Sequence, residues 1–175
     1  LTEMTDVLLR HQGTLDKYIG DAIVAFYGAP APVKDQEKKA CSTSLEMHER
    51  LDHLRTKWKN EGEWPDIVYN MQHRIGLNSG QMVTGNMGSE MRMNYTMMGD
   101  TVNLAARLEP AAKQYGVYIL VGENIYEATN DEYAFRFLDF LSVKGKTIPI
   151  KAYELIQTKE SINKKSIELV DLFEK

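Results

Sequence analysis

The side chains best suited to bind a phosphate ligand lie on one expected helix, residues 101–115. Its apolar positions recur at the spacing of an amphipathic helix, and Asp100 before it is a good N-cap type. Asn103 and Arg107 lie four residues apart on a neighbouring face, so an amide and a guanidinium project side by side. Arginine binds phosphate through a fork of donors, and asparagine adds neutral donors and acceptors. For these two residues taken alone, an ordinary solvated helix face is the alternative interpretation.

A carboxylate and a lysine lie on an expected β-hairpin upstream. Two β-like runs, residues 14–19 and 22–27, meet at Gly20-Asp21, which predicts a tight turn with Asp21 at its tip. Aspartate in a turn commonly bonds its own backbone, so a cation ligand and a turn residue are both open readings of Asp21. Lys17 shares a strand face with Ile19 in a pattern of period two, and a solvated edge lysine is its simpler interpretation.

Two further features of the sequence could bind a ligand or a partner. Val143-Lys144-Gly145-Lys146 places two cations around a glycine, where the backbone can turn tightly under an anion, although surface lysines are equally consistent. Four methionines (Met91, Met93, Met97 and Met98) lie close together in the sequence. Flexible thioethers suit an adaptable contact surface, and core filling is the equal alternative.

The composition is that of a globular domain. The 175 residues, 43% of them hydrophobic, are enough for one domain with a sizeable core. A formal net charge of −4 gives no field that would gather a nucleic acid polymer or an anionic membrane. Cys41 is the only cysteine, which favours a reducing compartment, and no apolar run is long enough to span a membrane. These features lead us to expect a cytoplasmic location.

Three motifs in register resemble the class III adenylate and guanylate cyclase catalytic domain. The stretch from Met98 to Glu109 (Met-Gly-Asp-Thr-Val-Asn-Leu-Ala-Ala-Arg-Leu-Glu) looks like the signature helix of that family. Lys17-Tyr18-Ile19-Gly20-Asp21 and Val143-Lys144-Gly145-Lys146 resemble two more of its motifs, in the family's order. The resemblance covers roughly residues 1–155.

The expected fold is α+β. The element order of helix, hairpin, helix, hairpin, helix, strand, helix and closing strands predicts a mainly antiparallel sheet flanked by helices. The resemblance implies a ferredoxin-like core that forms a head-to-tail homodimer with its sites at the interface. We expect a catalytic domain over residues 1–156 and a charged helical tail over residues 157–175.

The resemblance also implies an activity and roles for particular residues. An adenylate cyclase converts ATP to 3′,5′-cyclic AMP and pyrophosphate with two divalent ions, Mg²⁺ or Mn²⁺. Asp21 matches one of the aspartates that hold the metal pair, and Arg107 matches the arginine that stabilises the transferring phosphate. Asn103 matches the residue that orients the ribose, and Lys144 the position that binds the terminal phosphates.

Lys17 and Thr96 match the family's adenine-reading pair. An ammonium only donates, which suits the acceptor N1 of adenine, and a hydroxyl can accept from the 6-amino group. Guanine carries a proton on N1 and an acceptor at O6, so this pair would leave its polar groups unmatched. The pair therefore predicts ATP as the substrate.

One departure from the family lies upstream of the hairpin. Only sixteen residues precede Lys17, whereas family members carry there an earlier strand with the first metal aspartate. We therefore expect a fragment that lacks its first strand and helix, is inactive alone, and belongs to a longer protein with an upstream regulatory domain. Two alternative functions stay open, an inactive cyclase-like regulatory or dimerisation domain and a guanylate cyclase. The parent protein could also carry a membrane anchor. If the chain alone were active, Asp16 or Asp100 would be candidates to complete the metal site.

Several elements are predicted from local pattern. We expect a long helix over residues 33–59, a hairpin formed by residues 73–80 and 81–88, and a polar loop over residues 89–93. A buried strand is expected at 117–121, a short helix at 123–129, and closing strands at 133–140 and 150–155. His48 and His53 are five residues apart, which does not place two metal ligands on one helical face.

Overall fold

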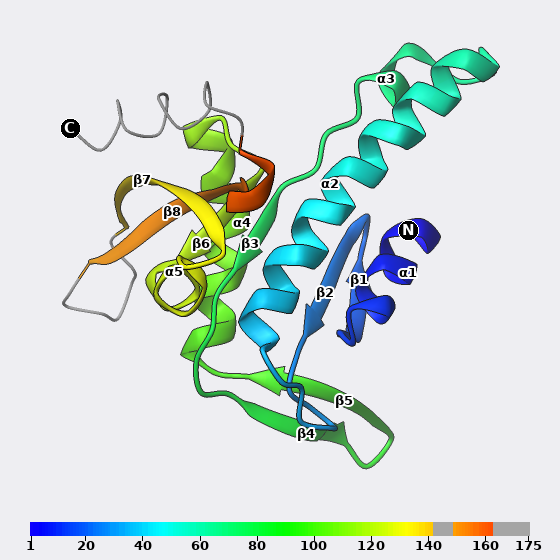
Figure 1. The fold of residues 1–175 in the computed structure, drawn as a ribbon. Helices are drawn as coiled ribbons and strands as arrows, with labels where there is room; N and C mark the ends of the chain where they lie inside the picture. The colour runs from blue at the N-terminus through cyan, green and yellow to red at the C-terminus, as the bar shows by residue number, and fades with distance from the viewer. Residues whose placement is uncertain (142–148, 163–175) are drawn as a thin grey trace. The chain divides into compact units, whose positions relative to one another are not determined.

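The computed structural model describes residues 1–141 and 149–162. The chain forms two compact units, Leu1–His73 and Arg74–Lys175. Figure 1 labels the elements of both units. Among the described residues, no helix is both long enough and apolar enough to cross a membrane.

The first unit contains three helices and one hairpin. Helix α1 packs on α2 and on strand β1, and its buried residues are Val7 and Leu8. The buried residues of α2 lie mostly in its N-terminal half, whereas its last three turns are largely exposed. The elements are α1 (Thr2–Arg10), β1 (Thr14–Ile19), β2 (Ala22–Phe26), α2 (Gln36–Glu61) and α3 (Asp66–Tyr69).

The hairpin expected at Gly20-Asp21 is confirmed. Strands β1 and β2 are antiparallel, and Ile19 lies opposite Ala22, so Gly20 and Asp21 form a two-residue turn. Gly20 has a φ of 62°, a left-handed conformation that glycine adopts without steric cost. The register shifts between Leu15 and Lys17, which marks an irregularity of the β-bulge type in β1.

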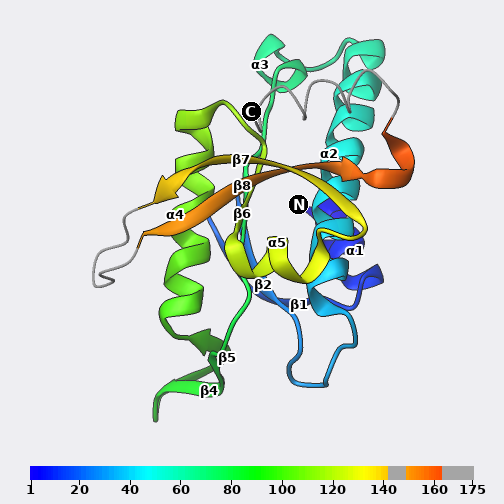
Figure 2. The same cartoon turned by 60° about the vertical axis from the view of Figure 1, so that its left-hand side comes forward.

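The second unit is built on a four-stranded sheet in the order β3-β6-β8-β7. Strand β3 is parallel to β6, and the other two pairings are antiparallel. Figure 2 shows β7 and β8 running side by side, with α5 close to them. The strands are β3 (Ile75–Leu77), β6 (Ile119–Gly122), β7 (Tyr133–Leu141) and β8 (Ile150–Thr158), and the helices are α4 (Asp100–Tyr115), α5 (Glu123–Thr129) and a 3₁₀ turn (Lys159–Ser161).

Helix α4 packs on β3 and β6 around the core of this unit. The core residues are Leu104, Leu108, Ala112, Val117, Leu120 and Ala152. At Gly76 of β3 the helix backbone approaches closely, because a Cβ there would lie 2.5 Å from both Ala105 O and Glu109 N. Glycine at this position therefore permits the helix to lie directly on the strand.

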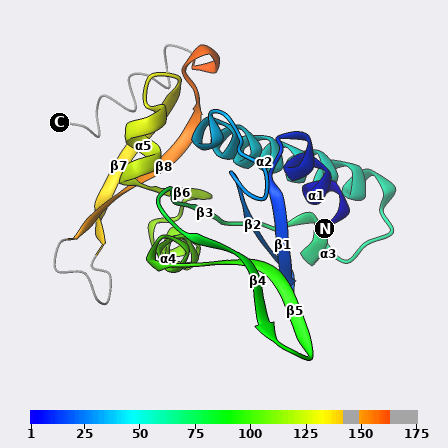
Figure 3. The ribbon, with the colours of Figure 1, turned by 90° about the horizontal axis from the view of Figure 1, so that it is seen from below.

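The hairpin predicted for residues 73–80 and 81–88 was wrong. Strand β3 does not form a hairpin with the following segment but pairs with β6, with Ile75 opposite Ile119. The hairpin lies further on, between β4 (Val83–Ser89) and β5 (Arg92–Met98), and Gly85 lies opposite Thr96 in it. The expected loop over 89–93 is thus the tip of this hairpin, which Figure 3 shows projecting from α4.

Three of the four clustered methionines are exposed on the β4–β5 hairpin, whereas Met97 is half-buried. Met91, Met93 and Met98 are 96%, 61% and 60% exposed. Core filling is therefore the wrong reading for these three residues, and an adaptable contact surface is the reading that stays open.

The other local predictions are confirmed with small shifts. Helix α5 and strand β6 lie where the pattern placed them. Strand β8 continues to Thr158, two residues past the expected domain boundary at residue 156. The helical tail expected beyond that point falls mostly on residues 163–175, which lie outside the described residues.

Candidate active site

Lys17 and Asp21 lie together on the β1–β2 hairpin. On the strand, the Tyr18 hydroxyl bonds the hydroxyl of Thr5 in α1 at 2.8 Å, so Tyr18 points to the face that α1 covers. Because neighbouring strand residues point to opposite faces, Lys17 lies on the other face. Its side chain is 45% exposed, and Asp21 is exposed in the turn. A cation and an anion are thus both accessible at this end of the hairpin.

Asp16 lies beside Lys17, a placement that sequence reasoning missed. Its Oδ2 lies 3.4 Å from Lys17 Nζ, and its side chain is only 3% exposed. Aspartate is rarely buried unless it has a charged partner. Here the charged neighbour is Lys17, the candidate base-binding residue. Nothing in the sequence signals this burial, because a single carboxylate in a strand is typical of a solvent-facing position.

Asn103 and Arg107 lie one turn apart on α4, and both are exposed. Between them in the sequence is Leu104, which is 4% exposed and packs into the core, and Leu108 is fully buried. The apolar face of α4 is therefore packed against the sheet. Asn103 and Arg107 lie one turn apart on the exposed face, as the helical spacing predicted. Such a helix can present both groups rigidly to a ligand.

Helix α4 begins differently from the expectation. Gly99, with a φ of 146°, is the N-cap residue, and no side chain caps the first turn. Asp100 is the first helical residue instead of the N-cap, and its carboxylate lies in the acidic first turn. There it interacts favourably with the helix dipole, whose positive end lies at the N-terminus.

The remaining two candidates are placed differently. Thr96 is half-buried on β5, opposite Gly85 of β4. Lys144 lies outside the described residues. The described candidates therefore form two groups, Lys17 and Asp21 in the first unit and Thr96, Asn103 and Arg107 in the second.

The positions of the carboxylates show whether the described part of the chain can hold a metal ion. Asp21 is accessible and has the chemistry of one ligand for Mg²⁺ or Mn²⁺, which prefer oxygen donors. Within residues 1–141 and 149–162, however, no three histidine, cysteine, aspartate or glutamate side chains are grouped so that they could hold an ion. Asp21 alone therefore does not make a complete metal site.

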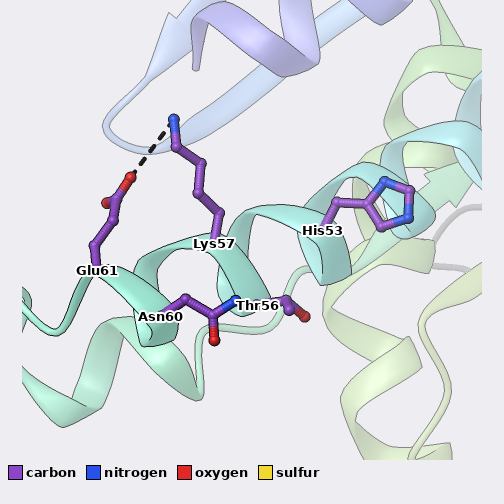
Figure 4. A pocket seen from close by; sticks show the side chains of 5 residues that line it. All are labelled: His53, Thr56, Lys57, Asn60 and Glu61. Atoms are coloured by element: carbon purple, nitrogen blue, oxygen red, sulfur yellow. Dashed lines mark ion pairs between the residues drawn. The ribbon is translucent and has the colours of Figure 1, made fainter.

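A shallow hollow of about 580 Å³ lies elsewhere, along the exposed end of α2. Figure 4 shows that its lining side chains all come from this one helix, and Lys57 and Glu61 form an ion pair there at 3.8 Å. None of the candidate residues lines it. The lining residues are His53, Thr56, Lys57, Asn60 and Glu61.

Comparisons with known proteins agree with this arrangement of elements. The solved adenylyl cyclase CyaB from P. aeruginosa superposes with a TM-score of 0.79 at 30% identity, over 93% of this chain and 81% of that one. The guanylyl cyclase Cya2 superposes with a TM-score of 0.74, also at 30% identity, over 93% of this chain and 79% of that one. The mixed α+β class, with antiparallel strands flanked by helices, is thereby confirmed.

Sequence relatives lead to the same family. Adenylate cyclase 1 of Rhizobium meliloti (strain 1021) is 30% identical over 159 residues, which are 91% of this chain and 23% of that protein. The chain thus spans about a quarter of that relative's length. The family profile described as adenylate and guanylate cyclase catalytic domain matches residues 1–157. This chain belongs to the adenylate and guanylate cyclase catalytic domain family.

Proposed function

We propose that this domain is an adenylate cyclase, which converts ATP to 3′,5′-cyclic AMP and pyrophosphate. The observation that carries the choice of ATP is Lys17, whose ammonium lies on the accessible face of β1, four residues before Asp21. Two solved relatives with the same 30% identity act on different purines by their names. The choice of base must therefore come from the residues that read it.

The base preference follows from donor and acceptor patterns. Lys17 can donate to N1 of adenine, and the Thr96 hydroxyl can accept from the 6-amino group. With guanine, the Lys17 ammonium would face the proton on N1, and the polar groups of the base would be mismatched. A mismatched buried polar group costs roughly 1–3 kcal/mol, which corresponds to about one to two decades of discrimination.

The reaction needs positive charge where the phosphate changes. Attack of the ribose 3′-oxygen on the α-phosphorus forms the ring ester and breaks the bond to pyrophosphate, so negative charge develops on the transferring phosphate. In this proposal Arg107 stabilises that charge through its fork of donors, and Asn103 holds the ribose in the geometry of attack. Lys144 binds the terminal phosphates that leave.

Asp21 is proposed as one ligand of the Mg²⁺ or Mn²⁺ ions that the family uses. Within the described residues, no further ligands are gathered into a site around Asp21.

We further propose that two copies form a head-to-tail homodimer. The β4–β5 hairpin supports self-association, because it exposes large apolar side chains that an isolated soluble domain seldom presents together. These residues are Val83, Met91, Met93, Tyr95 and Met98. In such a dimer, Asp21 and Lys17 of one copy would meet Asn103 and Arg107 of the other.

The alternative that the sequence leaves open is an inactive cyclase-like domain that regulates or dimerises. The two functions differ in one assay. The full-length protein that carries this domain is incubated with ATP or GTP and Mn²⁺, and the products are separated by chromatography. Cyclic product that disappears in the Arg107→Ala variant supports the enzyme, and its absence supports the inactive domain.

A further inference from the structure

Strand β1 has an irregular register next to Lys17. Leu15 lies opposite Ala25, whereas Lys17, two residues later, lies opposite the adjacent Val24. Asp16 is therefore the extra residue of a β-bulge in this strand. Bulges bend a strand locally and change the direction in which a side chain points.

The bulge brings Asp16 and Lys17 together. On a regular strand, neighbouring side chains point to opposite faces of the sheet. Here the Asp16 carboxylate lies 3.4 Å from the ammonium of Lys17, its direct neighbour in the chain. The carboxylate is 3% exposed and the lysine 45% exposed, so one partner is fixed in the protein and the other reaches toward solvent.

This arrangement differs from an ordinary surface ion pair. Lys34 and Asp35 are also neighbours in the sequence, but they lie 3.9 Å apart with side chains 91% and 54% exposed. Two mobile, hydrated groups of that kind constrain each other little. A buried carboxylate, by contrast, cannot follow the lysine into solvent, so the lysine must adopt the conformation that reaches it.

We propose that Asp16 is a positioning residue for base selection, which holds the Lys17 ammonium where the purine is read. This inference rests on the proposed function, in which Lys17 contacts adenine. Lysine carries its charge on a flexible four-carbon stem and loses rotamer freedom when it binds a ligand in one geometry. Asp16 removes this freedom before the ligand binds, so the ammonium stabilises the base whose acceptor lies at its fixed position. A mobile ammonium would contribute less to the binding of either base and would discriminate less between them.

The test is the Asp16→Asn variant of the full-length protein, which keeps the shape of the side chain and removes its charge. We expect the ATP preference, measured as the ratio of kcat/KM for ATP and GTP, to fall about tenfold, through a raised KM for ATP. Asp35→Asn removes the carboxylate of the exposed neighbour pair and should leave the ratio unchanged. Thermal unfolding of each variant verifies that it is folded, and Asp16→Ser replaces Asp16→Asn if that variant is not.

A double-mutant cycle separates positioning from other roles of Asp16. If Asp16 acts through Lys17, Asp16→Asn should not change the ATP/GTP ratio further in a Lys17→Ala background. An unchanged ratio in Asp16→Asn, equal losses with both nucleotides, or a persistent effect without Lys17 would each overturn the proposal. Equal losses accompanied by weaker Mn²⁺ dependence would identify Asp16 as a metal ligand instead.

A nucleotide-binding measurement tests the positioning role of Asp16 independently of turnover. Displacement of a fluorescent ATP analogue by ATP and by GTP gives the ratio of their affinities for each variant. If the unsubstituted protein makes no cyclic product, the proposed activity fails, but the affinity ratio still tests whether Asp16 positions Lys17. We expect the same fall of about tenfold in that ratio for Asp16→Asn.

Discussion

His48 Nδ1 of α2 lies 3.2 Å from Nε2 of His73, the last residue of the first unit. Their rings are 5.3 Å apart between centroids, at an interplanar angle of 45°. One nitrogen of such a pair must donate and the other accept, so the bond requires at least one neutral imidazole. Burial, and the neighbouring His48, lower the pKa of His73 to about 4, while the nearby Asp52 opposes the shift.

This pair predicts that the fold is destabilised by acid. His73 stays neutral in the folded chain down to about pH 4, whereas in the unfolded chain it takes up a proton near its ordinary pKa of about 6.5. Its contribution is therefore fully present above pH 6.5 and is lost as the pH falls from about 6.5 to about 4. We expect a loss of the order of 2–3 kcal/mol, since each unit of pKa is worth about 1.4 kcal/mol and partial exposure reduces the effect.

Denaturant unfolding between pH 7.5 and pH 4.5 measures this loss, since each extrapolated free energy of unfolding gives one point of the curve. The His73→Gln variant should show a flatter curve than the unsubstituted chain. His53→Gln, at an exposed position of α2, is the matched control and should keep the original slope. Parallel curves for all three proteins would contradict the role of His73.

Base preference should follow Lys17 and Thr96. Replacing Lys17 by Glu and Thr96 by Cys reverses the pattern of donors and acceptors, because Glu accepts where Lys donates. The double variant should shift from ATP toward GTP by about one to two decades in kcat/KM. If it keeps the full ATP preference of the unsubstituted protein, these two residues do not read the base.

Composite sites predict complementation between inactive variants. Asp21→Ala and Arg107→Ala should each be nearly inactive alone, the second because it removes a charged donor at a developing charge. Mixed together, the two variants should regain activity, since a heterodimer carries one intact site. An inert mixture, with subunit exchange demonstrated by labelled protein, would count against a site shared between two copies.

Gly76 predicts a packing effect that is independent of catalysis. A methyl group at this position would lie 2.5 Å from backbone atoms of Ala105 and Glu109 in α4, so the helix would have to move. We expect Gly76→Ala to destabilise the protein by roughly 1–3 kcal/mol, as overpacking commonly does. Gly85→Ala, where a Cβ would meet no atom within 4 Å, is the control, and equal midpoints in thermal unfolding would refute the close contact.

Local patterns predicted the elements whose partners lie close in the sequence. The β1–β2 hairpin was found because Gly20-Asp21 is a strong turn signal between two apolar runs. Helices α4 and α5 were found because their apolar spacing or flanking glycines delimit them clearly. In the candidate site, the neighbouring placement of Asn103 and Arg107 followed from helical geometry alone.

Features that depend on distant segments were not predictable in this way. Strand β3 has three residues, and its partner Ile119 lies far along the chain, so nothing local distinguished this parallel pairing from a hairpin with the next run. The bulge at Asp16 has no pattern of its own, because a single carboxylate in a strand looks like an ordinary solvent-facing residue. The relation between Asp16 and Lys17 therefore became visible only in the folded hairpin.

The most direct test of the central claim is a competition between the two purine nucleotides. The full-length protein receives equimolar ATP and GTP with Mn²⁺, and mass spectrometry quantifies 3′,5′-cyclic AMP and 3′,5′-cyclic GMP in the same sample. We expect cyclic AMP in excess by at least about tenfold, together with an equal amount of pyrophosphate, because Lys17 and Thr96 match only adenine. Predominant cyclic GMP, or no cyclic product from either nucleotide, would contradict the assignment of this domain as an adenylate cyclase.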